Sequence, residues 1–191
     1  MNHYYRCSCP QGYRVGANGQ TCQDIDECAE HNIDCGPDMM CFNTRGKFEC
    51  VETPCPPNYD RDPTTGFCRL ECEKANIACP PNSKYAEVLA FKMVALPSGI
   101  QAYQDLVRLS AYDHSGVHLP NTIFTIIENE TGIPFRIRLE EGRGVLYTLQ
   151  ALDSSQDYRM KVNAVSVDNE QQTVQYSTKF LIYISVSEFP Y

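Results

Sequence analysis

The sequence predicts a chain of two parts, in which small disulfide-rich modules are followed by an all-β antiparallel sandwich. All eleven cysteines lie between Cys7 and Cys79. The remainder lacks cysteine and consists of short stretches rich in β-branched and aromatic residues, separated by turn residues. Small modules with few large apolar residues bury too little surface to fold without cross-links, whereas the second part can form its own hydrophobic core.

The cysteine-rich part indicates an extracellular protein, because disulfides persist in oxidising compartments. Zinc is the alternative, but the cysteine spacings are irregular and lack Cys-x-x-Cys pairs with a histidine partner. The opening segment has neither the basic nor the apolar region of a signal peptide, and the cysteine count is odd, so we expect a fragment of a longer secreted protein. The sequence contains no run of eighteen apolar residues, and its net charge of −8 argues against a nucleic-acid partner.

The six cysteines from Cys28 to Cys68 predict a small cross-linked module, although their spacing alone does not give the pairing. Two signatures surround them, Asp24-Ile25-Asp26-Glu27-Cys28 and Cys41-Phe42-Asn43-Thr44-Arg45-Gly46-Lys47-Phe48-Glu49-Cys50. Residues 24–69 resemble the calcium-binding EGF module, and this resemblance implies the pairings Cys28–Cys41, Cys35–Cys50 and Cys55–Cys68. Four residues separate Cys50 from Cys55 where the family usually has one, so we expect the C-terminal loop of the module to be displaced.

The cysteines outside this module extend the same pattern. Residues 1–23 resemble the second half of a preceding EGF module, which implies that Cys9 pairs with Cys22 and that the partner of Cys7 precedes Met1. A free functional cysteine at position 7 is the alternative. Cys72 and Cys79 are expected to pair with each other within a connector of residues 70–80, and each bridge contributes about 2–4 kcal/mol, mainly by constraining the unfolded chain.

The two signatures of the EGF module supply oxygen donors, and calcium prefers six to eight such ligands. The carboxylates of Asp24 and Glu27 and the amide oxygen of Asn43 are the candidate side-chain ligands. The resemblance adds three backbone carbonyls to this set, those of Ile25, Thr44 and Lys47. Asp26 lies within the signature but is not an expected ligand. An acidic surface loop without calcium is the alternative interpretation.

The resemblance also implies roles for residues beside the calcium site. Tyr13 is expected to pack on the Arg45–Gly46 turn of the next module, and Phe48 to form an apolar wall that shields the site. Asn43 is a candidate for β-hydroxylation. Calcium at this junction is expected to stiffen the two EGF modules into a rod, with a dissociation constant of about 10⁻⁴–10⁻³ M.

The second part, residues 81–191, predicts seven strands of an antiparallel sandwich. Their expected ranges are Glu87–Leu96, Leu106–Tyr112, Ile123–Ile127, Phe135–Leu139, Val145–Leu149, Asp157–Val167 and Thr173–Val186. A turn is expected at residues 168–170. This part resembles the fibulin-type C-terminal module of fibulins and hemicentins, and the segments 138–149 and 158–164 are more similar to hemicentins. The sequon at Asn129 predicts an N-glycan.

The function implied by this resemblance is structural. We expect a secreted glycoprotein of the extracellular matrix, including the basement membrane, in which a calcium-stiffened EGF tandem presents the sandwich to matrix proteins, cell-surface receptors or further copies of itself. A secreted ligand or receptor-ectodomain module that acts through one cell-surface receptor is the alternative. No catalytic residue is predicted. The run Asp113-His114-Ser115 has the residue types of a hydrolase triad, but adjacent residues cannot adopt triad geometry, and His114 with His118 would need a third ligand to bind a metal.

Overall fold

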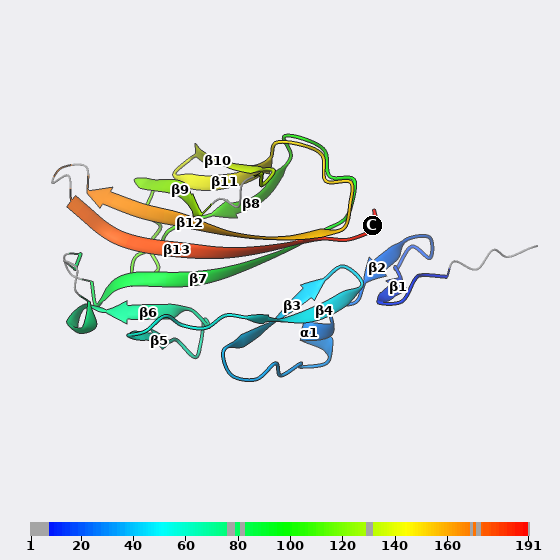
Figure 1. The fold of residues 1–191 in the computed structure, drawn as a ribbon, viewed down its shortest axis with the longest axis horizontal. Coiled ribbons are helices and arrows are strands. Elements are labelled where there is room, and N and C mark those ends of the chain that lie inside the picture. Colours follow the sequence, from blue (N-terminus) through cyan, green and yellow to red (C-terminus); the bar gives the residue numbers. More distant parts are fainter. Residues whose placement is uncertain are drawn as a thin grey trace, which may run out of the picture.

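The computed structural model describes residues 8–75, 79–80, 83–128, 132–168, 170 and 173–190 (Figure 1). Three features that the sequence predicts fall on other residues. Cys7 and the sequon at Asn129 lie outside the described residues, as does Asn169 of the expected turn.

The cysteine-rich part consists of three short antiparallel hairpins, one turn of α-helix and one turn of 3₁₀-helix. The elements are β1 (Tyr13–Val15), β2 (Cys22–Asp24), α1 (Glu27–Glu30), β3 (Met39–Thr44), β4 (Lys47–Glu52), β5 (Tyr59–Arg61), β6 (Cys68–Glu71) and η1 (Cys72–Lys74). Disulfides join the cysteines in the pairs expected above, namely Cys9–Cys22, Cys28–Cys41, Cys35–Cys50, Cys55–Cys68 and Cys72–Cys79. These bridges take the place of a large core in this part of the chain.

The second part forms a two-layer sandwich, and the predicted fold class is confirmed. Its strands are β7 (Tyr85–Leu96), β8 (Asp105–Leu109), β9 (Thr122–Glu128), β10 (Phe135–Glu140), β11 (Arg143–Thr148), β12 (Gln156–Asp168) and β13 (Thr173–Val186). One layer has the strand order β10-β11-β8, and the other has the order β5-β6-β7-β13-β12-β9. The side chains that close the space between the layers include Leu109, Phe135, Leu146, Val162, Ile182 and Ile184, all nearly inaccessible to solvent.

One strand pair of the sandwich is parallel, which the prediction of an antiparallel sandwich did not include. β13 runs beside β7 in the same direction, from Thr178 opposite Val88 to Val186 opposite Leu96. β7 begins the sandwich and β13 ends it, so the intervening strands serve as the long crossover that a parallel pair requires.

The strand expected at Leu106–Tyr112 is shorter than predicted and ends at Leu109. The carboxylate of Asp113 accepts hydrogen bonds from the backbone N–H groups of Ser115 and Val117, at 2.8 and 2.9 Å. These bonds fold the segment after β8 into a turn, because an aspartate side chain can replace backbone partners in this way.

The C-terminal loop of the calcium-binding module is displaced into the sheet of the sandwich. Its hairpin, β5–β6, continues the larger layer, because β6 pairs with β7 from Cys68 opposite Leu89 to Glu71 opposite Tyr85. The domain limits proposed from the sequence, at residues 23/24 and 69/70, therefore fall inside strands β2 and β6. Figure 1 shows β3 and β4 beside the larger sheet, and β1 and β2 beyond the ends of its strands near the C-terminus.

A second, smaller core fills the seam between the EGF module and the outer face of the larger sheet. Leu89 and Phe91 of β7 are buried there with Cys68. The partly buried side chains packed against them come from both sides of the seam: Met40, Cys55, Tyr59, Leu181 and Tyr183. The Tyr183 hydroxyl also donates a hydrogen bond to the carbonyl of Glu52 at the end of β4, at 2.9 Å.

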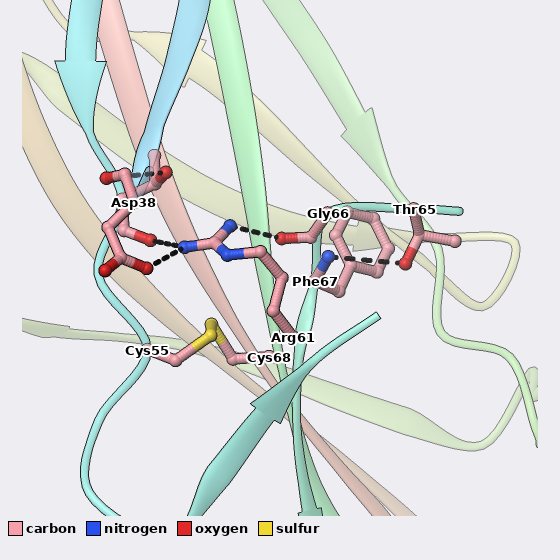
Figure 2. The surroundings of a disulfide bond; sticks show 8 residues. Asp38, Cys55, Arg61, Thr65, Gly66, Phe67 and Cys68 are labelled. Carbon is pink, nitrogen blue, oxygen red and sulfur yellow. Dashed lines mark hydrogen bonds and ion pairs between the residues drawn. A yellow bond between two sulfur atoms is a disulfide. The ribbon is translucent and has the colours of Figure 1, made fainter. Parts of the chain in front are cut away.

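Arg61 of β5 ties the displaced hairpin to the body of its module (Figure 2). Its guanidinium donates to the carbonyls of Gly66 (2.9 Å) and Thr53, and forms an ion pair with Asp38 (3.2 Å). The same group lies 5.9 Å from the ring centre of Phe91. One side chain therefore joins the loop before β3, the turn before β6 and the sheet of the sandwich.

A buried carboxylate completes the seam. Glu87 of β7 is only 8% exposed and accepts a hydrogen bond from the hydroxyl of Tyr59 on β5. Lys179 of β13 lies 2.9 Å from the same carboxylate, and Ser177 lies 3.5 Å from its second oxygen. A buried carboxylate needs such partners, and here they come from the EGF hairpin as well as the sandwich.

We predict that this seam weakens at alkaline pH through Tyr59. Burial and the hydrogen bond to Glu87 raise the pKa of Tyr59 above its ordinary value of about 10. The folded state therefore keeps the phenol protonated after the unfolded chain has begun to ionise, so its stabilisation is complete below about pH 10 and is lost as the pH rises further.

The measurement is urea unfolding between about pH 8 and 11 with free thiols alkylated. The free energy of unfolding should fall more steeply in the native chain than in Tyr59→Phe, whereas Tyr103→Phe, at a site 74% exposed, should follow the native chain. Equal slopes for all three proteins would contradict the prediction.

Candidate metal centre

The junction of the two EGF modules brings Asp24 to the candidate calcium site. Asp24 is the last residue of β2 and lies opposite Tyr13 in the β1–β2 hairpin. Its carboxylate accepts hydrogen bonds from Asn43 Nδ2 at 2.8 Å and from the backbone N–H of Gly46 at 2.5 Å. A strand of the first module therefore delivers a carboxylate to the β3–β4 hairpin of the second.

Glu27 enters the same site from α1. Asp26 caps this helix through a 3.0 Å hydrogen bond from Ala29 N–H, which fits the expectation that Asp26 is not a ligand. The Glu27 N–H donates to Asn43 Oδ1 at 3.3 Å, so Glu27 and Asn43 are adjacent. Asn43 thus bridges the two acidic residues.

One oxygen of the Glu27 side chain indicates that this site suits a cation. Oε2 is buried and has no hydrogen-bond partner among the residues that the structure describes. A buried acceptor left unpaired costs about 1–3 kcal/mol, and more when it is charged. Two carboxylates and an amide oxygen within one small region are the hard donors that calcium prefers, so the residues present fit this ion.

The β3–β4 hairpin carries the other expected ligands. Thr44 and Lys47 form its closing pair, and Thr44 Oγ1 donates to the Lys47 carbonyl at 2.7 Å. The hydrogen bond and 2.7 Å ion pair with Glu49 raise the pKa of the Lys47 ammonium. This group is therefore held by Glu49, and the Lys47 carbonyl accepts the hydrogen bond from the Thr44 hydroxyl. Ile25, the remaining expected ligand, is fixed by its N–H bond to the Gly12 carbonyl at 3.0 Å.

The packing of the two modules depends on Tyr13 and two glycines. Tyr13 is 7% exposed, and a Cβ added to Gly46 would lie 2.8 Å from its ring. A Cβ added to Gly12 would lie only 1.9 Å from the Gly46 carbonyl oxygen. Tyr13 thus lies on the turn where the resemblance implied. Phe48 is opposite Asn43 in the hairpin and is 38% exposed, so it is the less buried of the two expected packing residues.

Three features of this junction did not follow from the motifs. The backbone of Gly12 lies close to the Arg45–Gly46 turn of the β3–β4 hairpin. Arg14 forms a 2.7 Å ion pair with Glu30 of the next module. Phe189, near the C-terminal end of the chain, contacts Tyr13. The Gly12-Tyr13 pair was the available signal for the first of these. The other two depend on contacts between segments distant in sequence, and no local pattern reports them.

Of the other polar residues considered as sites, Asp113 and His114 have hydrogen-bond partners, whereas the buried Nε2 of His118 has none among the described residues. The Asp113 carboxylate caps its own turn, and His114 Nδ1 lies 3.1 Å from the Tyr176 hydroxyl. Within the described ranges, no three or more His, Cys, Asp or Glu side chains gather as metal ligands, and the candidate set considered above has two carboxylates, those of Asp24 and Glu27. None of the helices in these ranges is long and apolar enough to cross a membrane.

Comparison with known families identifies both EGF modules. Residues 4–27 match the Complement Clr-like EGF-like family, and residues 24–68 match the Calcium-binding EGF domain family. The second match includes all six expected ligand residues, and the metal of this module is calcium.

Longer relatives align with nearly the whole chain. Human Hemicentin-1 is 49% identical over 187 residues, which is 98% of this chain and 3% of that protein. Mouse Hemicentin-2 is 38% identical over 188 residues, 98% of this chain and 4% of that protein. Mouse Fibulin-7 is 29% identical over 191 residues, 97% of this chain and 43% of that protein. The chain therefore corresponds to a small part of the hemicentins and to less than half of fibulin-7.

Proposed function

We propose, on the premise that this chain belongs to the hemicentin and fibulin family, that it is a calcium-stiffened unit of an extracellular-matrix glycoprotein. The unpaired, buried Oε2 of Glu27 carries this proposal, because the backbone N–H of the same residue donates to Asn43, which in turn donates to Asp24. It supports a site for a divalent cation at the joint between two EGF modules, where an ion would have mechanical consequences.

The residues that would hold the ion come from both sides of the joint. They are the side chains of Asp24, Glu27 and Asn43 and the carbonyls of Ile25, Thr44 and Lys47. When bound, calcium supplies an electrostatic cross-link among these oxygens. Asp24 belongs to the hairpin of the first module and Asn43 to that of the second, so holding both restricts rotation of one module against the other.

The stiffened unit includes the sandwich as well as the EGF modules. The β6–β7 pairing, the apolar seam and the Glu87 network attach the second EGF module to the outer face of the larger sheet. The calcium joint therefore sets the direction in which the preceding module leaves this block. In this proposal the ion controls the orientation of the sandwich surface, and the sandwich makes the contacts with binding partners.

The partners that suit this role are matrix and basement-membrane proteins, cell-surface receptors and further copies of the chain. We place the protein in the extracellular matrix, with an N-glycan at Asn129 and β-hydroxylation at Asn43 as accompanying modifications, and expect no enzymatic activity. These assignments rest on the family and on the disulfide-dependent fold.

Solid-phase binding of the full chain to matrix extract, with and without millimolar calcium, tests the proposal. The full chain is required because a fragment beginning after β6 would lose two strands of the larger sheet, β5 and β6. We expect association with several matrix components that persists at raised salt. Saturable binding to a single cell-surface receptor, without retention on matrix, would instead support a signalling module and overturn the structural role.

A further inference from the structure

The segment after β13 continues alongside the residues that follow β7. Ser187 N–H donates to the carbonyl of Leu96 at 2.9 Å, and Phe189 N–H donates to Ser187 Oγ at 3.0 Å. Ser98 N–H donates to the Phe189 carbonyl at 2.9 Å. Phe189 is therefore held in a defined position by the end of β7, and Figure 1 shows this end of the chain beside β1 and β2.

From this position Phe189 reaches the calcium joint. Its ring lies edge-on to that of Tyr13, with 5.8 Å between the ring centroids and an interplanar angle of 83°. Such edge-to-face pairs are favourable beyond the apolar area that they bury. A cleft of about 640 Å³, lined by Phe189, lies between the Thr44–Lys47 turn on one side and the start of β12 and the end of β13 on the other. The aromatic pair therefore spans the two parts of the molecule at the edge of a gap.

Tyr13 transmits the contact to the ligands. Its ring lies on Gly46, whose N–H donates to the Asp24 carboxylate at 2.5 Å, and its backbone is opposite Asp24 in the β1–β2 hairpin. A shift of the Tyr13 ring would therefore release the turn that orients Asp24. Phe189 contacts the same Tyr13 ring from the sandwich.

We propose that Phe189 is a positioning residue for the calcium centre, which it preforms by holding Tyr13 against Gly46. This inference rests on the proposed calcium-stiffened joint and adds that the affinity of the joint depends on the sandwich. Coupling between two sites is reciprocal, so calcium binding also stabilises the docking of the segment around Phe189.

The test is calorimetric titration of the oxidised full chain with calcium. Phe189→Ala should weaken calcium binding by about 2- to 12-fold, which corresponds to the energy of one aromatic pair. Phe189→Tyr should restore the affinity of the native chain. Tyr103→Ala, which removes an aromatic side chain 74% exposed in the same module, is the matched control and should bind calcium like the native chain.

A purely structural role for Phe189 predicts a different pattern. In that case Phe189→Ala would lower the unfolding temperature equally in EDTA and in calcium and leave the dissociation constant unchanged, which would overturn the inference. Calcium should also slow hydrogen exchange at the amides of Ser98 and Phe189 in the native chain, and unchanged exchange would count against it. If the native chain takes up no calcium, the proposed function itself fails, so the two failures are distinguishable.

Discussion

Asp24→Asn is expected to weaken calcium binding by about 100-fold, whereas Asp26→Asn should change it less than threefold. Calcium affinity depends on the number of charged ligands, and unaltered extracellular sites of this kind have dissociation constants of about 10⁻⁴–10⁻³ M. Loss of the Asp24 carboxylate should therefore move the dissociation constant to about 10–100 mM, so that millimolar calcium produces little heat of binding. Calorimetric titration of the oxidised chain measures this directly.

The paired variants separate ligation from general charge. Each removes one negative charge, and the two positions are two residues apart, so weak electrostatic attraction of calcium to the surface changes equally in both. Asparagine at position 26 also preserves the cap of α1, because asparagine is as good a helix cap as aspartate. Similar losses in both variants would mean that the segment acts as an acidic surface loop.

The parts of the structure that the sequence predicted are those specified by neighbouring residues. The alternation in 158–164 identifies β12 because side chains of a strand point to opposite faces in turn, and this pattern needs no information from the rest of the chain. The EGF signatures likewise place Asp24, Glu27 and Asn43 within one module of cross-linked loops. Local patterns therefore located most of the strands and assigned the three candidate ligand side chains to one module.

The unpredicted parts depend on contacts between distant segments. The parallel pairing of β7 with β13 joins the first and last strands of the sandwich, and either direction is compatible with their alternation. The unusual spacing between Cys50 and Cys55 indicated that the following loop was displaced, but its destination depends on Leu89 and Phe91, which lie in another module.

The Glu87 network illustrates the same limit for polar residues. In sequence Glu87 is the one acidic residue of a mostly apolar strand that also contains Lys92, and nothing nearby indicates its partners. Tyr59 lies 28 positions before it and Lys179 lies 92 positions after it. A buried carboxylate must be satisfied, but only the three-dimensional arrangement identifies the groups that satisfy it.

Gly12→Ala is expected to separate the two EGF modules and weaken calcium binding more than tenfold. The added Cβ would lie 1.9 Å from the carbonyl oxygen of Gly46. The Cβ is bonded directly to Cα and the oxygen is a backbone atom, so no side-chain rotation relieves the overlap. The modules must move apart, which disrupts the Ile25 N–H bond to Gly12 and the packing of Tyr13 on the turn. Together these contacts exceed the 1.4 kcal/mol that corresponds to a tenfold change in affinity.

Gly19→Ala is the matched control for this variant. Gly12 and Gly19 both have positive φ, +82° and +68°, so alanine introduces comparable backbone strain at each, but a Cβ at Gly19 would meet no atom within 4 Å. Any difference in calcium affinity or cleavage rate between the variants therefore reports the contact of residue 12 with Gly46. In calcium, trypsin should cleave after Arg45 faster in Gly12→Ala than in Gly19→Ala, and EDTA should remove most of that difference by loosening the joint in both. Equal calcium affinities and cleavage rates in the two variants would mean that the close approach of these backbones has no part in forming the site, and that the ion does not act on the angle between the modules.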